Sequence, residues 1–77
     1  MKFTATDAQP LDDETNMILV VSDVQTNAPY YGVNVVFNTA TREIVDLVAA
    51  DAISERELTQ YLSDIIATAK RAYKDFF

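Results

Sequence analysis

The chain has 77 residues and a formal net charge of -6, from 12 acidic and 6 basic side chains, and it contains no cysteine, histidine or tryptophan. The missing residue types exclude disulfides and remove the usual ligands of zinc. The acidic balance argues against direct binding to nucleic acid or to anionic membranes, which require a basic patch. It is compatible with a protein partner that has a basic surface.

The length predicts one domain, residues 1–77, close to the size at which a single hydrophobic core is only just sufficient. Small chains without disulfides often gain stability by forming oligomers. No apolar run approaches the roughly 20 residues of a membrane span, and no apolar signal segment follows the N-terminus. Together with the lack of cysteine, these features favour a cytoplasmic protein, and no motif indicates a cofactor.

The first 16 residues have two interpretations, a flexible acidic arm or a short edge strand. Residues 2–6 have the composition of a short strand. Residues 7–16 contain Pro10 and the acidic run 12–14, which predict an exposed loop. The consecutive acids lack the alternation and the glycine of a calcium loop, so we expect no metal there.

Residues 17–24 form the most apolar segment and are rich in β-branched side chains, which predicts a strand. Both faces of this strand are apolar, whereas a half-exposed antiparallel strand alternates. One helix can cover only one face of a small sheet. The second face must therefore meet a loop, the N-terminal segment or another copy of the chain.

The middle of the chain predicts a β-hairpin. Pro29 marks a turn over residues 25–29, and residues 30–38 then alternate as a strand. Gly32, the only glycine, indicates a bulge or a close backbone approach. Residues 38–42 are typical of a tight hairpin loop, and residues 43–48 form the next strand.

The last third of the chain predicts one long amphipathic helix. Ser54 and Glu57 match a capping box, and Ile53 and Leu58 have the spacing of a hydrophobic staple, so the helix begins after Ser54. A helix over residues 55–77 would span about 34 Å at ~1.5 Å per residue. That is longer than the strands, so its aromatic end either folds back onto the core or is buried in a partner.

Catalysis is not indicated, and we predict that the protein is not an enzyme. A serine nucleophile needs an activating base, usually histidine, which is missing. Asp23 and Asp46 are the only acids inside predicted apolar strands, and we expect them on an exposed face or at a strand end. Tyr30 and Tyr31 are typical of cross-strand packing, with a ligand groove as the alternative.

The predicted fold is α+β. It is a three-stranded antiparallel meander, with a fourth strand from the N-terminal segment as an alternative, packed on one long C-terminal amphipathic helix. The two-sided apolar strand and the aromatic helix end predict a homodimer. The candidate interaction residues are Tyr73, Phe76, Phe77, Tyr30, Ile18 and Val20.

The leading functional hypothesis is a small acidic protein–protein interaction module, an adaptor or regulator that acts as a homodimer. The alternative is an acidic decoy or inhibitor, of the kind that phages and mobile elements encode, which occupies a basic nucleic-acid-binding surface of a partner. Binding that weakens steeply with added salt would favour the decoy, because charges would then dominate. A third class, a small ligand held between subunits, cannot be argued from the residues.

Overall fold

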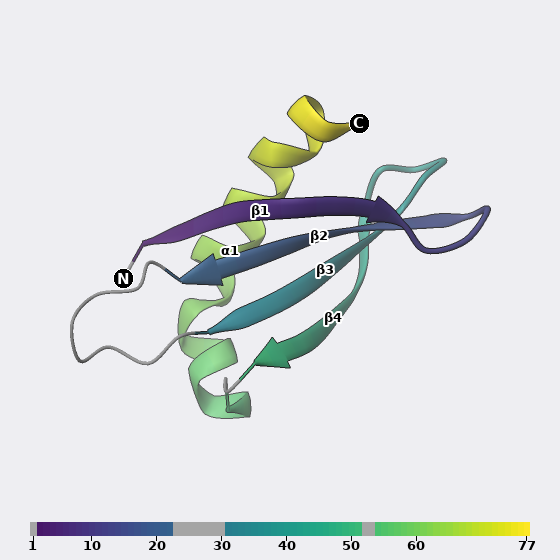
Figure 1. Ribbon diagram of the computed structural model, residues 1–77. Coiled ribbons are helices and arrows are strands. Elements are labelled where there is room, and N and C mark those ends of the chain that lie inside the picture. Colours follow the sequence, from purple (N-terminus) through teal and green to yellow (C-terminus); the bar gives the residue numbers. More distant parts are fainter. Residues whose placement is uncertain (1, 23–30, 52–53) are drawn as a thin grey trace.

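Residues 2–22, 31–51 and 54–77 are described by a computed structural model (Figure 1). One antiparallel sheet packs against one C-terminal helix, which confirms the predicted α+β class and the fourth strand. The elements in chain order are β1 (Phe3–Pro10), β2 (Thr15–Ser22), β3 (Gly32–Asn38), β4 (Ile44–Asp51) and α1 (Glu55–Phe76).

The sheet is a meander with the strand order β1-β2-β3-β4, so each strand pairs with its neighbours in the sequence. The predicted hairpin is confirmed as β3 and β4, where Val35 pairs with Leu47. The register shifts between Gly32 and Val33, where β4 has one additional residue, so an irregularity lies beside the single glycine, in line with the first of its two predicted roles. The predicted turn over residues 25–29 lies outside the described residues. The order of the strands in the meander agrees with the prediction.

The N-terminal segment departs from its predicted structure. Residues 7–10 continue β1 and residues 15–16 begin β2, so the prediction of a loop over 7–16 was wrong outside the turn 11–14. Pro10 is tolerated because it ends an edge strand, where its missing N–H removes no ladder bond. A bulge between Ala5 and Asp7 adjusts the strand to its partner.

The β1–β2 turn is organised by the Asp12 carboxylate. Its Oδ1 atom accepts hydrogen bonds from the backbone N–H of Glu14 at 2.8 Å, the N–H of Thr15 at 2.8 Å and the Thr15 hydroxyl at 2.9 Å. The backbone bond from Glu14, then the two bonds from Thr15, lower the pKa of Asp12 below its ordinary value. The acidic run is therefore an ordered tight turn.

We expect Asp12→Asn to lower the melting temperature at neutral pH, because the charged acceptor is lost. Since folding lowers the pKa of Asp12, its stabilising effect is complete above the ordinary value of 3.8 and is lost as the pH falls through the lowered value. The difference in melting temperature between wild type and variant should then shrink in acid. Thermal unfolding followed by circular dichroism measures this, with Asp13→Asn as the matched control. An equal effect of both substitutions would contradict the role of Asp12.

Helix α1 begins as the sequence predicts. The Ser54 side chain accepts from the backbone N–H of Glu57 at 3.2 Å, and the Glu57 carboxylate accepts from the Ser54 hydroxyl at 2.9 Å. This differs from the predicted box, in which the carboxylate would reach the Ser54 N–H. Ile53, the other half of the predicted staple, lies outside the described residues.

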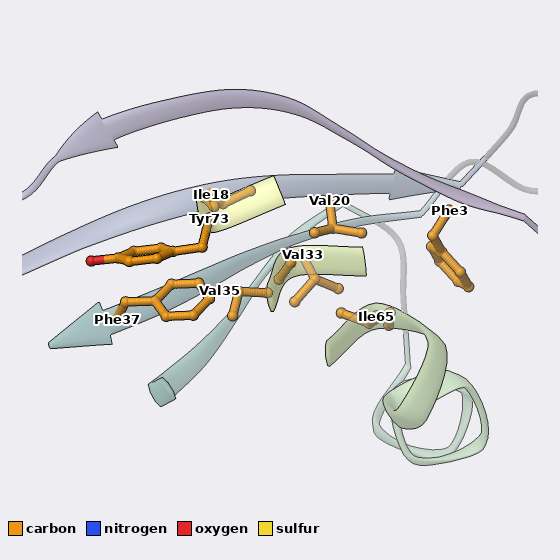
Figure 2. Packing of buried hydrophobic residues seen from close by; sticks show 9 residues of the cluster. Phe3, Ile18, Val20, Val33, Val35, Phe37, Ile65 and Tyr73 are labelled. Carbon is orange, nitrogen blue, oxygen red and sulfur yellow. The ribbon is translucent and has the colours of Figure 1, made fainter. Parts of the chain in front are cut away.

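The core lies between one face of the sheet and α1, which lies over β1, β2 and β3 (Figure 1). Within the described residues, the backbone of α1 makes no close contact with β4, although the Ile44 and Leu47 side chains of β4 pack against the core. The central side chains are shown in Figure 2 and come from all three covered strands and the helix. They are Phe3, Ile18, Val20, Val33, Val35, Phe37, Ile65, Ala69 and Tyr73. The alternation predicted for β3 is confirmed, since Val33, Val35 and Phe37 lie on this face and Val36 lies on the other.

Candidate interaction surface

The sheet face that points away from α1 is the open face, and its centre is apolar. The register places β2 residues Met17, Leu19 and Val21 opposite the helix-facing Ile18 and Val20. The apolar side chains that the register places on the open face include Met17, Leu19, Val21, Val36 and Val48. Val21 and Val36 are buried, Met17 and Leu19 are half-buried, and Val48 is 47% exposed. The prediction that β2 is apolar on both faces is thus confirmed.

Two carboxylates flank this apolar centre, one at each edge of the sheet. Asp7 on β1 pairs with Leu19, and Asp46 on β4 pairs with Val36, so both side chains lie on the open face. Their strand neighbours Ala8 and Leu47 pack against the core on the other face, which fixes this orientation. The described residues of the open face include no lysine or arginine. An acid-flanked apolar surface results.

At each edge of the sheet, one outward backbone N–H group is occupied by the carboxylate of the preceding residue. The Asp7 Oδ1 atom accepts from the backbone N–H of Ala8 at 2.9 Å, and the Asp46 Oδ1 atom accepts from the N–H of Leu47 at 2.8 Å. The hydrogen bond from the Ser22 N–H group to the Tyr31 carbonyl shows which residues of β2 and β3 point toward each other. Followed through the strand pairings, this alternation directs the N–H groups of Ala8 and Leu47 to the outer edges. A carboxylate therefore occupies a donor that an added strand would need.

The structure places the predicted interaction residues in three different environments. Ile18 and Val20 are fully buried under α1, so the folded chain cannot present them to a partner. Both faces of β2 are apolar, and the sequence alone did not decide which one the helix covers. The half-buried neighbours Met17 and Leu19, which alternate with them, lie on the open face instead. Tyr30 lies outside the described residues.

The aromatic helix end is divided between core and surface. Tyr73 is buried and stacks on Phe37 with ring centroids 4.3 Å apart, so this ring folds back as one of the two predicted alternatives. Phe77 contacts Tyr73 at a centroid distance of 5.2 Å. Phe76 and Phe77 remain 47% and 49% exposed. The overhang predicted from the helix length therefore amounts to two half-exposed rings.

Asp46 and Tyr31, two of the residues considered for catalysis or ligand binding, have structural contacts. Asp46 is exposed and engaged in its edge bond, as expected for a strand carboxylate outside the core, and Asp23 lies outside the described residues. Tyr31 is buried and packs its ring near Tyr61 at 6.3 Å, which is a packing role. No three acidic side chains of the described part gather into a group that could hold a metal ion.

Comparisons of the chain with protein-family models, with curated proteins and with solved structures returned no match. No helix in the described ranges combines the length and the apolar character that a membrane crossing requires. The candidate site is therefore defined by its geometry alone.

Proposed function

We propose that the chain is a non-enzymatic protein–protein interaction module that forms a homodimer through the open face of its sheet. The observation that carries this proposal is the apolar centre formed by Met17, Leu19 and Val48 on the side opposite α1. The occupied N–H group at each edge hinders strand addition there, which favours association through the face. Aligned packing of two sheets, about 10 Å apart, is an ordinary way to cover such a face.

The size of the open face fits this use. Four strands at ~4.8 Å spacing and about 25 Å of strand length give a footprint of roughly 19 by 25 Å. Two such footprints together approach about 1,000 Å², which is the lower range of specific interfaces. A domain of 77 residues without disulfides also gains stability when it covers further apolar surface. A second copy of the chain can cover the open face without any other kind of molecule.

The test is the oligomeric state of Leu19→Gln, measured by sedimentation equilibrium. Removing one leucine contact from each subunit should weaken the dimer at least about tenfold, because a buried leucine contributes about 1.5–3 kcal/mol. The matched control is Leu11→Gln, which makes the same change at an exposed leucine of the β1–β2 turn. A wild-type chain that is monomeric at concentrations on the order of 10 µM, or equal effects of both substitutions, would refute the homodimer.

A second candidate function is favoured by the carboxylates Asp7 and Asp46, which flank the apolar centre without a neighbouring base. In a face-to-face homodimer these acids would approach their own copies, whereas a basic partner would neutralise them. An acidic decoy or inhibitor that covers a basic nucleic-acid-binding surface therefore remains the alternative. Its binding should fall steeply with added salt, while association of two apolar faces should not.

A further inference from the structure

A cationic cleft lies on the helix side of the molecule, away from the open face. It is formed between the second half of α1 and the β3–β4 turn and has a volume of about 230 Å³. Its lining residues are Phe37, Arg42, Lys70, Tyr73 and Lys74. A neighbouring hollow of about 390 Å³ shares Arg42 and Lys70 and is completed by Glu43, Ile44 and Ile66. The hollow lies where α1 does not cover β4.

The charges of this cleft are opposite to those of the whole chain. Arg42, Lys70 and Lys74 are three of the 6 basic residues in a protein of net charge -6. Lys70 and Lys74 are one helical turn apart, a spacing at which like charges repel each other. Within the described part of the chain, none of the three forms an ion pair. Their proximity therefore costs stability in the free protein, and an anion would reverse that cost.

The backbone conformation of Arg42, which lines the same cleft, also costs conformational energy. Its φ angle is 62°, the left-handed region that glycine and asparagine adopt most readily. Arg42 ends the loop that connects β3 and β4, and its N–H donates to the Asn38 carbonyl at 2.8 Å. A glycine would form this loop with less strain. Strained residues of this kind are frequent at ligand-binding sites, and here the strain places a guanidinium at the cleft.

We propose that this cleft binds a small phosphate ester. Three cations suit a dianionic phosphate better than a single carboxylate, because the Arg42 guanidinium can form two parallel hydrogen bonds while Lys70 and Lys74 act as point charges. The organic part of the ligand then lies in the neighbouring hollow against Ile44 and Ile66. The site is independent of the open face, so either proposal can fail without the other.

The experiment is a titration of the ¹⁵N-labelled protein, followed by NMR at constant ionic strength, with three probes: inorganic phosphate, phenyl phosphate and benzoate. Inorganic phosphate should give saturable shifts at Arg42, Lys70 and Lys74, with a Kd on the order of 1 mM. Phenyl phosphate should bind at least about threefold more tightly, because its ring adds apolar contact. Benzoate, which has the ring but a single negative charge, should bind about tenfold more weakly than phenyl phosphate.

Two variants of Arg42 separate binding from structure. Arg42→Gln should weaken phenyl phosphate binding at least about tenfold, whereas Arg56→Gln, the same change at an exposed arginine of the first helical turn, should have little effect. Arg42→Gly should lose binding and raise the melting temperature together, because glycine relieves the strain. Binding that does not saturate, shifts spread over all basic residues, or equal effects at Arg42 and Arg56 would overturn the proposal.

Discussion

Phe37→Ala is expected to lower the melting temperature by at least about 12 °C. Phe37 is 1% exposed and stacks on Tyr73, so truncation leaves a cavity and removes an aromatic pair. Such changes cost about 3–5 kcal/mol. A domain of 77 residues has roughly 4–12 kcal/mol of stability at ~0.05–0.15 kcal/mol per residue, and each kcal/mol shifts the melting temperature by about 4–8 °C. The variant therefore loses a large share of the stability of the domain.

The control for Phe37→Ala is Phe76→Ala, which removes the same side chain from a half-exposed position at the helix end. Thermal unfolding followed by circular dichroism should show a loss at Phe76 less than half that at Phe37, since less apolar area leaves water in the native state. Equal losses would mean that the helix end, and not the Phe37–Tyr73 stack, is the centre of the core.

The second large effect is expected at a buried polar pair that joins the sheet to the helix. The Asn16 Nδ2 group donates to the Tyr73 hydroxyl at 3.3 Å, while the buried Asn16 Oδ1 atom has no hydrogen-bond partner. Tyr73→Phe should cost about 1–3 kcal/mol, because the whole Asn16 amide is then buried without a partner. Adding Asn16→Leu should restore most of this loss, since an apolar side chain of similar shape needs no hydrogen bond.

A double-mutant cycle checks this prediction. Urea unfolding of the wild type, Tyr73→Phe, Asn16→Leu and the double variant gives the coupling free energy, which we expect at about 0.5–3 kcal/mol. A double variant whose destabilisation equals the sum of the two single losses would show that the hydrogen bond contributes nothing. The contacts of Asn16 would then not explain why a polar side chain is buried at this position.

Sequence patterns predicted the local features of this fold correctly. The Ser54 cap, the turn after Asn38 and the irregularity beside Gly32 each depend on a few adjacent residues, and each was found in its predicted place. The end of β1 could not be predicted in the same way. Residues 7–10 have weak strand propensity and form a strand because β2 offers a free edge, which is a contact between distant parts of the chain.

The candidate surfaces were harder to predict than the elements. Both faces of β2 are apolar, and only the position of α1 decides that Leu19 lies on the open face while Ile18 is buried in the core. The cationic cleft brings Arg42 from a turn together with Lys70 and Lys74 from the helix, and no spacing in the sequence links them. An arginine at the end of a hairpin loop, where glycine or asparagine is usual, was the one available signal.

The meander order of the sheet has a consequence for how the chain folds. Because every strand pairs with its neighbour in sequence, each hairpin closes a short loop, and the sheet can grow one strand at a time. The helix is different, since the Asn16–Tyr73 contact joins residues 57 positions apart. Docking of α1 therefore joins distant parts of the chain, and until it occurs the sheet has two apolar faces exposed to water. Docking of α1 covers one of these two faces. The open face is the one that remains uncovered when a single chain has folded.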